Sequence, residues 1–227
     1  MRGGGLIARY AATGGTPPEY TFAIDRARTS RLLIVPPLFD EMNKMRRLLV
    51  ETMRRLDRAD IDSFLIDLPG TNESTAELER QDAEGWQSAA SAAAEHFRAT
   101  HVVGVRGGAM FVPVDLPGLL YAPVAGAQTL NRMLRSRTIA AREAGREENA
   151  TMLLERGLRD GIDLAGYRLG ASMIAALTQR HVPVRPGLAT IDRDAVGGGG
   201  MWLRAEPGDA PEQADALAAI VARELTA

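Results

Sequence analysis

The sequence predicts an α/β protein with a mostly parallel central sheet covered by helices on both faces. Short apolar runs of strand length alternate along the chain with longer segments whose apolar residues recur at helical spacing. Several apolar runs are followed by glycine or proline, which are typical of the turns at strand ends. We expect residues 1–227 to form a single domain, because 227 residues suffice for one substantial packed core.

The first half of the chain supplies the early strands and helices. Residues 1–18 are rich in glycine and proline, and we expect them to be irregular. The compact apolar run Arg31-Leu-Leu-Ile-Val35 ends in Pro36-Pro37 and predicts a buried strand. Further strands are predicted over 20–24, 61–68 and 102–105, and helices over 41–58 and 83–98.

In the second half of the chain, predicted strands and helices alternate less regularly. Residues 127–160 are helical in pattern and highly charged, which is typical of a solvated helix face. We expect this segment to form a small helical lid over the strand ends. The remaining predicted elements are strands over 119–124, 163–169 and 201–205, a further strand within 182–191, and helices over 171–178 and 211–226.

The composition favours a soluble cytoplasmic protein and disfavours several other classes. The formal net charge of −2 gives no sign of nucleic-acid binding. The sequence contains no cysteine, which excludes disulfides, thiolate nucleophiles and cysteine metal sites. No apolar run approaches the roughly 18 residues that a membrane-spanning helix needs. We therefore expect no membrane span and no nucleic-acid partner.

A glycine turn follows the predicted strand 102–105. The run Gly104-Val105-Arg106-Gly107-Gly108 has the spacing of the G-x-S-x-G nucleophile elbow of α/β-hydrolases, with arginine in place of serine. An elbow places its central side chain at the mouth of a pocket and aims the following backbone N–H groups at the same place. Arginine stays protonated and is not a nucleophile. The motif predicts a hydrolase frame without ordinary hydrolase chemistry.

A second polar group follows the predicted strand 31–35. The segment 36–47 reads P-P-L-F-D-E-M-N-K-M-R-R, and in α/β-hydrolases this loop supplies one N–H of the oxyanion hole. A plainer interpretation makes Asp40 the N-cap of a helix. Because ligands bind at the carboxyl ends of parallel strands, we expect this loop and the elbow to surround one crevice. The predicted ligand-binding residues are Phe39, Glu41, Asn43, Arg46, Asp67, Arg106, Gly107 and Gly108.

Four segments together resemble one known family. They are residues 36–47, Ile66-Asp67-Leu68-Pro69-Gly70, Gly104-Val105-Arg106-Gly107-Gly108-Ala109 and Ala165-Gly166-Tyr167-Arg168-Leu169. The family that they resemble is the second type of exosortase A system-associated hydrolase. The resemblance covers about residues 30–175 and implies an α/β-hydrolase-like protein encoded beside exopolysaccharide and exosortase machinery in Gram-negative bacteria. It also implies arginine at the elbow, which Arg106 fits, and it implies no particular substrate.

This chain departs from the family pattern after the elbow. Pro113 and Pro117 leave room for only about two turns of helix there. A shorter helix changes the shape that we expect for the pocket.

The sequence offers no well-placed histidine and no clear acid for a Ser-His-Asp triad. The chain order of such a triad is nucleophile, acid, histidine, which calls for a histidine near residues 206–210. The histidines are His96, His101 and His181, and none lies there. Asp192 and Asp194 lie where a triad acid would fall, although aspartate is also common in turns. Because the histidines are scattered, we expect no metal and no cofactor.

Arg106 admits two interpretations that are compatible with each other. Its guanidinium suits a carboxylate or phosphate, and Gly107 and Gly108 would open a helix whose free N–H groups attract anions. This predicts a site for a small anionic or acyl ligand. Alternatively, Arg106 forms an internal ion pair with Glu41 or Asp67, because a buried charge needs a partner. Both hold if a ligand displaces the carboxylate.

Several functions follow from these observations. The leading hypothesis is a pseudoenzyme of α/β-hydrolase fold that lacks the triad and binds a small anionic or acyl ligand at the former nucleophile site. A second is an active, esterase-like hydrolase in which Ser172, Ser74 or a water held by Glu41 acts. A third is an interaction subunit that docks through 127–160, with a homodimer as one form. A carbohydrate-binding module is disfavoured, because two tryptophans, Trp86 and Trp202, are too few and too far apart for sugar stacking.

Overall fold

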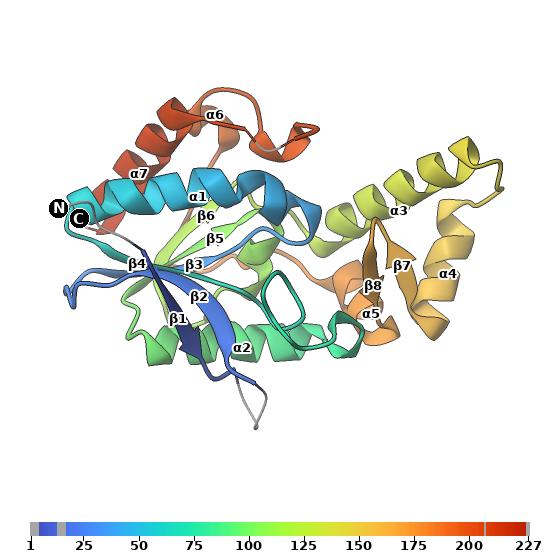
Figure 1. Cartoon of the computed structure of the whole chain (residues 1–227), viewed down its shortest axis with the longest axis horizontal. Helices are drawn as coiled ribbons and strands as arrows, with labels where there is room; N and C mark the ends of the chain where they lie inside the picture. Colours follow the sequence, from blue (N-terminus) through green and yellow to red (C-terminus); the bar gives the residue numbers. More distant parts are fainter. Residues whose placement is uncertain (1–4, 13–16, 207, 226–227) are drawn as a thin grey trace.

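The computed structural model of the chain describes residues 5–12, 17–206 and 208–225. Its centre is a seven-stranded sheet with the strand order β1-β2-β4-β3-β5-β6-β9 (Figure 1). β2 runs antiparallel to both of its neighbours, and the other pairs of the sheet from β4 to β9 are parallel. The strands are β1 (Leu6–Tyr10), β2 (Glu19–Ile24), β3 (Arg31–Val35), β4 (Asp62–Ile66), β5 (His101–Val105), β6 (Gly118–Tyr121) and β9 (Leu188–Ile191).

Two hydrophobic cores lie on opposite faces of the sheet. Because side chains alternate along a strand, Leu33 and Val35 face one core and Leu32 and Ile34 face the other. The first core packs against α2 (Ala83–His96), and the second packs against α1 (Asp40–Arg58) and α7 (Pro211–Leu225). Figure 1 shows α1 and α7 on one side of the sheet and α2 on the other. The predicted α/β architecture with a mostly parallel sheet is confirmed.

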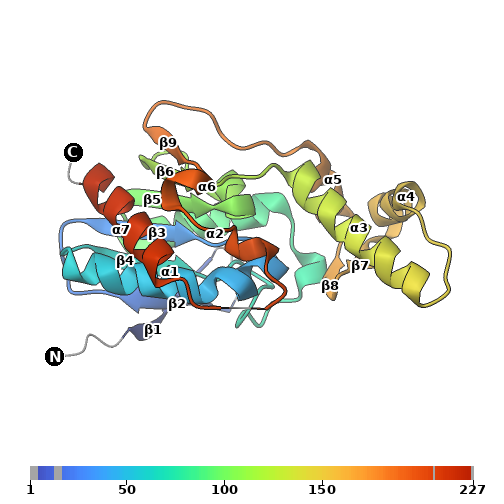
Figure 2. The same ribbon diagram turned by 90° about the horizontal axis from the view of Figure 1, so that it is seen from above.

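A block of three helices and two short strands lies at one end of the molecule, beyond the carboxyl ends of the parallel strands (Figures 1 and 2). α3 and α4 form a helical hairpin, and both helices pack against α5. β7 and β8 pair with each other outside the main sheet. The block consists of α3 (Gly126–Glu143), α4 (Ala150–Asp160), β7 (Ile162–Leu164), β8 (Tyr167–Leu169) and α5 (Ala171–Gln179). The hairpin thus occupies the segment 127–160 that the sequence predicts to be helical.

Three of the predicted elements differ from the structure. Residues 6–10, expected to be irregular, form β1 at the edge of the sheet by pairing with β2. The single strand predicted over 163–169 is two strands, because Ala165 and Gly166 take left-handed φ angles of +50° and +85° and turn the chain back. The strand predicted over 201–205 is instead the 3₁₀ helix η3 (Met201–Leu203).

Other boundaries shift by only a few residues. β6 ends before the predicted residue 124, because Ala122 has a φ of +43° that ends the extended backbone. Asp40 is the first residue of α1 and not its N-cap, which is Phe39. The predicted end of the last helix at Thr226 lies outside the described residues. Among the helices that the structure describes, none is long and apolar enough to cross a bilayer.

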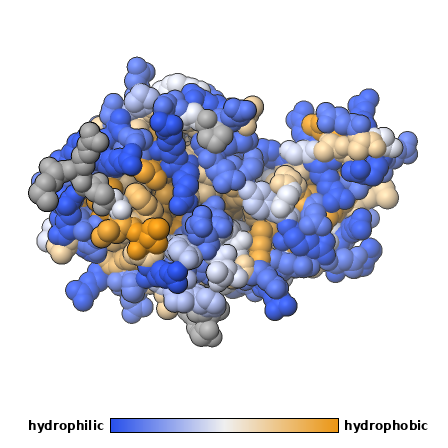
Figure 3. Space-filling model, in the orientation of Figure 1, coloured by the Kyte–Doolittle hydropathy of each residue, from blue (hydrophilic) through white to orange (hydrophobic). Residues whose placement is uncertain are grey.

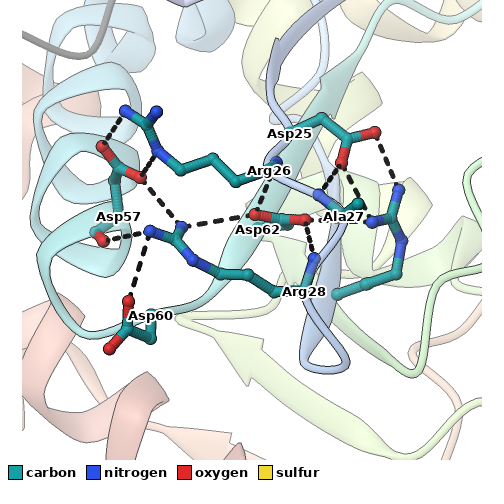
Figure 4. Close-up of polar contacts among 8 residues, drawn as sticks. Asp25, Arg26, Ala27, Arg28, Asp57, Asp60 and Asp62 are labelled. Carbon is teal, nitrogen blue, oxygen red and sulfur yellow. Dashed lines mark hydrogen bonds and ion pairs between the residues drawn. The ribbon is translucent and has the colours of Figure 1, made fainter.

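An ion network (Figure 4) joins the amino ends of β3 and β4. The elbow lies at the opposite end of the sheet, after the carboxyl end of β5. The centre of the network is Asp62, the first residue of β4, whose side chain is fully buried. The backbone N–H groups of Arg26 and Arg28 donate to its two carboxylate oxygens at 3.0 and 2.9 Å. The guanidinium groups of Arg28 and Arg31 also donate to it, at 3.3 and 2.9 Å. Asp62 therefore fixes the β2–β3 turn against β4.

We expect the substitution Asp62→Asn to lower the free energy of unfolding by about 3 kcal/mol, because it removes the fully buried carboxylate that Arg28 and Arg31 share and leaves them only Asp57, Asp60 and Asp25. Asp60→Asn is the matched control. Asp60 pairs with Arg28 at 3.3 Å, but its side chain is 90% exposed, so its loss should cost less than about 0.5 kcal/mol. Urea unfolding of both variants measures the difference. Equal losses of unfolding free energy in the two variants would show that Asp62 is not the centre of the network.

Candidate functional site

The predicted elbow is present at the carboxyl end of β5. Arg106 directly follows Val105 and has a φ of +52°, in the left-handed region that non-glycine residues seldom adopt. The 3₁₀ helix η2 (Arg106–Phe111) then leads the chain away from the sheet. Such a strained residue between a strand and a helix is the geometry of a nucleophile elbow. Arg106 therefore stands where a hydrolase of this fold has its nucleophile.

The glycines of the motif are required by close backbone approach. A Cβ atom on Gly104 would lie 2.6 Å from the Cα of Ala109, and one on Gly108 would lie 2.0 Å from the carbonyl oxygen of Pro36. A Cβ on Gly107 would meet the side chain of Leu38 at 2.9 Å. The elbow is thus packed tightly beneath the loop that follows β3. Gly107 and Gly108 are both buried in this contact.

The side chain of Arg106 is held by three partners. Its Nη2 and Nε donate to Oε1 of Glu41 at 3.1 and 3.3 Å, and its Nη1 donates to the carbonyl oxygen of Ala122 at 2.7 Å. The guanidinium lies 4.0 Å from the ring centroid of Trp202, which is a cation–π contact. Only 12% of the Arg106 side chain is exposed. The internal ion pair predicted between Arg106 and Glu41 is therefore formed.

Glu41 receives a second arginine from the helical hairpin. Nη1 of Arg132, on α3, donates to the same Oε1 atom, and the Glu41 side chain is 1% exposed. The Nη2 atom of Arg132 is buried and has no hydrogen-bond partner, although it lies 3.5 Å from Oδ1 of Asp40. Arg132 is itself 32% exposed. One buried carboxylate thus faces two guanidinium groups, one of which is open to solvent.

The charges of this cluster do not balance. Asp40 pairs with Lys44 one turn along α1, at 3.1 Å. Three cationic groups (Arg106, Arg132 and Lys44) and two carboxylates (Asp40 and Glu41) leave one positive charge in excess. Because guanidinium and ammonium groups form strong hydrogen bonds with charged acceptors, this excess of positive charge favours an anion at this end of the sheet.

Phe39 anchors the loop that carries Glu41. Its φ of +56° is strained, and its ring is buried against Trp86 and Tyr167, with ring centroids 5.9 and 5.3 Å away. Asn43, one turn further along α1, is exposed. The loop is thereby fixed on one side by the β7–β8 pair and on the other by Glu41.

Asp67 is buried near the site but does not contact Arg106. Its carboxylate accepts the side-chain amide of Asn72 at 2.9 Å and the backbone N–H of Glu73 at 3.2 Å. Arg46 approaches it at 3.7 Å, and the alternative ion pair of Asp67 with Arg106 is not formed. Burial raises the pKa of Asp67. Asp67 orders the loop after β4 and borders the site at one side.

The residues proposed for hydrolytic chemistry do not gather at the elbow. His101 opens β5 at the end of the strand opposite Arg106, and His96 and His181 are exposed elsewhere. Asp192 and Asp194 are exposed around a short helical turn after β9, where Asp194 pairs with Arg193 at 2.8 Å.

The two candidate serines are equally unsuited. Ser172 is exposed in the first turn of α5, and the Oγ of Ser74 accepts the N–H groups of Gly70 and Ala76 within its own loop.

Arg132 and Trp202 are site residues that the sequence did not single out. Arg132 lies in a segment with many arginines, and nothing in the pattern distinguishes the one that reaches Glu41. Trp202 follows the glycine run 197–200. The sequence predicts a strand here, and that prediction gives no indication that the Trp202 side chain contacts Arg106. Its indole covers Arg106 because η3 turns it inward against Tyr121, with ring centroids 6.2 Å apart.

We expect Gly108→Ala to destabilise the fold by at least about 2 kcal/mol, because the added Cβ forces backbone apart at the elbow. Gly199→Ala is the control, since a Cβ there has no heavy atom within 4 Å, and it should change the free energy of unfolding by less than about 0.5 kcal/mol. Thermal unfolding of both variants distinguishes them. A Gly108→Ala protein as stable as the wild type would show that the elbow is not tightly packed.

The sequence matches no protein-family model and no curated protein. Solved structures are similar over nearly the whole chain. The proline iminopeptidase-related protein of Thermus thermophilus is 13% identical over 98% of this chain and 97% of that chain, with a TM-score of 0.56. A bromoperoxidase from Bacillus anthracis is 13% identical over 98% of this chain and 100% of that chain, with a TM-score of 0.56.

Mouse alpha/beta hydrolase domain-containing protein 10 is 10% identical over 97% of this chain and 98% of that chain, with a TM-score of 0.55. At these identities the similarity concerns the fold. Together with the parallel sheet and the elbow after β5, it shows that this chain has the α/β-hydrolase fold.

Proposed function

We propose that this protein is a pseudoenzyme of α/β-hydrolase fold that binds a small anionic ligand, through a carboxylate or phosphate group, at Arg106 and Arg132. The observation that carries the proposal is the sharing of one buried carboxylate, Glu41, by two guanidinium groups. A guanidinium offers a planar fork of N–H donors that matches both carboxylate and phosphate. The excess positive charge of the cluster supplies the attraction.

The ligand would enter from the side of Arg132. This guanidinium is the more exposed of the two, and its Nη2 atom is buried without a hydrogen-bond partner. An anion that accepts from Nη2 satisfies this donor and replaces part of the contact with Glu41. Arg106 then contributes charge from beneath, held in place by Ala122 and Trp202. Lys44 and Asn43 would line the rim.

Serine-type hydrolysis receives no support from this geometry. The elbow holds an arginine that is already engaged with Glu41, and each of the three histidines lies away from it. A mechanism that uses a water on Glu41 would have to work through Oε2, because Oε1 accepts from both arginines. Binding without turnover is the function that the site supports best.

The proposal also assigns a role to the helical hairpin and a physiological role to the protein. The hairpin within 127–160 acts as a lid, which is supported by the reach of Arg132 from α3 to Glu41. The resemblance of residues 36–47 and of the elbow to the exosortase-associated family supports a role in exopolysaccharide-related physiology. An acyl portion of the ligand is compatible with this setting but is not required by the charged site.

The proposal predicts that inorganic phosphate and acetate raise the melting temperature of the wild type in a concentration-dependent way, because a ligand of the native state stabilises it. Arg132→Gln should weaken the apparent affinity for phosphate at least ~10-fold, since a charge-assisted hydrogen bond is worth about 1.5–3 kcal/mol. The matched control is Arg135→Gln, which removes the same charge from an exposed position on the same helix.

Thermal unfolding against anion concentration measures both effects. If Arg135→Gln weakens binding as much as Arg132→Gln does, the anions act only through overall charge and the site is refuted. If neither phosphate nor acetate stabilises the wild type, the ligand class is wrong.

A further inference from the structure

β1 forms an edge of the main sheet. Its partner on one side is β2, with Ala8 opposite Thr21 and Tyr10 opposite Glu19, and in the described part of the chain no strand pairs with its other side. An edge strand presents a row of backbone N–H and C=O groups that another strand can pair with. The strand is thus a ready template for a further strand.

The edge lacks the features that usually protect such a strand. Leu6 and Ile7 are 68% and 76% exposed, and they lie on opposite faces of the strand. No proline or bulge interrupts the run Leu6-Ile7-Ala8-Arg9-Tyr10. Its one charge, Arg9, is turned back onto its own sheet, where it donates to the hydroxyl of Tyr20 at 2.7 Å and stacks on that ring.

Apolar side chains also gather on the face of the molecule that carries this edge. Figure 3 shows an orange area over the region of β1 and β2, set among charged surface. Phe22 of β2 lies partly buried beneath the start of β1, because Gly5 leaves room for its ring. Exposed apolar surface at an unprotected strand edge marks a protein interaction site.

We propose that this edge binds a second copy of the same chain, with the two β1 strands antiparallel about a two-fold axis at Ala8. In that register Leu6 lies opposite Tyr10 of the other copy, and Ile7 lies opposite Arg9. Ile7 thus meets the long side chain of Arg9, whereas Leu6 lies beside Tyr10, whose side chain is buried in the core of its own chain. Like charges do not face each other across the axis. The smallest side chain of the strand, Ala8, meets its own copy at the axis.

Self-pairing fits this strand better than pairing with an unrelated one. An antiparallel pair of identical strands is self-complementary, as a two-fold interface requires. The product is one continuous sheet in which neither β1 is an edge. Five paired residues bury less than the ~1,600 Å² of a standard stable interface, so we expect self-association in the micromolar range.

The dimer would leave the anion site accessible. β2, β4 and β3 separate β1 from β5 in the sheet, so the elbow lies four strands away from the axis. The proposal therefore stands apart from the proposed binding function. A protein that does not dimerise could still bind an anion, and a protein that binds no anion could still dimerise.

Sedimentation velocity between about 1 and 200 µM tests the proposal. The wild type should pass from the 24.4 kDa monomer to twice that mass as concentration rises. Ile7→Asp should shift the midpoint at least tenfold to higher concentration, because it places a carboxylate in the paired edge. Val184→Asp is the matched control, since Val184 is exposed far along the chain, and it should leave the midpoint unchanged.

A cross-link provides the second test and does not depend on how Ile7→Asp folds. The chain has no cysteine, so Ala8→Cys introduces a single thiol. At a two-fold axis the two Cα atoms lie about 4.5–5.5 Å apart, within reach of a disulfide. Leu6→Cys is the control, because the two copies of that residue would lie ~13 Å apart along the strands.

We expect oxidation to link Ala8→Cys into a covalent dimer and to leave Leu6→Cys unlinked. A wild type that stays monomeric at 200 µM, together with no Ala8→Cys cross-link, would overturn the proposal. So would a dimer that Ile7→Asp leaves intact, or a Leu6→Cys protein that links as readily as Ala8→Cys.

Discussion

The contact on which the site depends is the pairing of one buried carboxylate with two arginines from separate elements. Glu41 comes from the start of α1, Arg106 from the elbow after β5, and Arg132 from the helical hairpin. These three segments are far apart in the sequence, and Glu41 joins them at the carboxyl ends of the parallel strands. A buried carboxylate is stable only with such partners, so its position fixes theirs. The ion pairs of Glu41 therefore hold three separate elements of the fold together at this site.

The contacts around Arg106 also explain how the elbow accommodates an arginine. The backbone at Arg106 is strained, and the side chain is largely buried at the end of β5, where an α/β-hydrolase has its nucleophile. The large guanidinium fits because Ala122 offers a carbonyl oxygen and Trp202 offers the face of its ring. The glycines around it are retained for packing, since Gly108 lies directly beneath Pro36. The elbow is thus a tightly packed structural turn with an arginine at its centre.

Much of the fold could be predicted from the sequence, because strands such as Arg31–Val35 and the amphipathic helix α1 carry strong local patterns. The elbow and the Arg106–Glu41 pair could be predicted as well, since glycine spacing and strand ends locate them. Residues 6–10 could not, because their strand exists only through pairing with β2. Arg132 and Trp202 could not either, because long-range packing and not local spacing brings them to Glu41 and Arg106.

The most direct test of the account is anion binding by Glu41→Gln. This change removes the internal carboxylate and leaves two guanidinium groups facing each other, which an added anion can bridge. The account predicts that Glu41→Gln is less stable than the wild type without ligand, and that its affinity for inorganic phosphate, followed by thermal unfolding, is at least ~10-fold higher. A variant whose phosphate affinity is unchanged or lower would contradict the claim that Glu41 occupies an anion site.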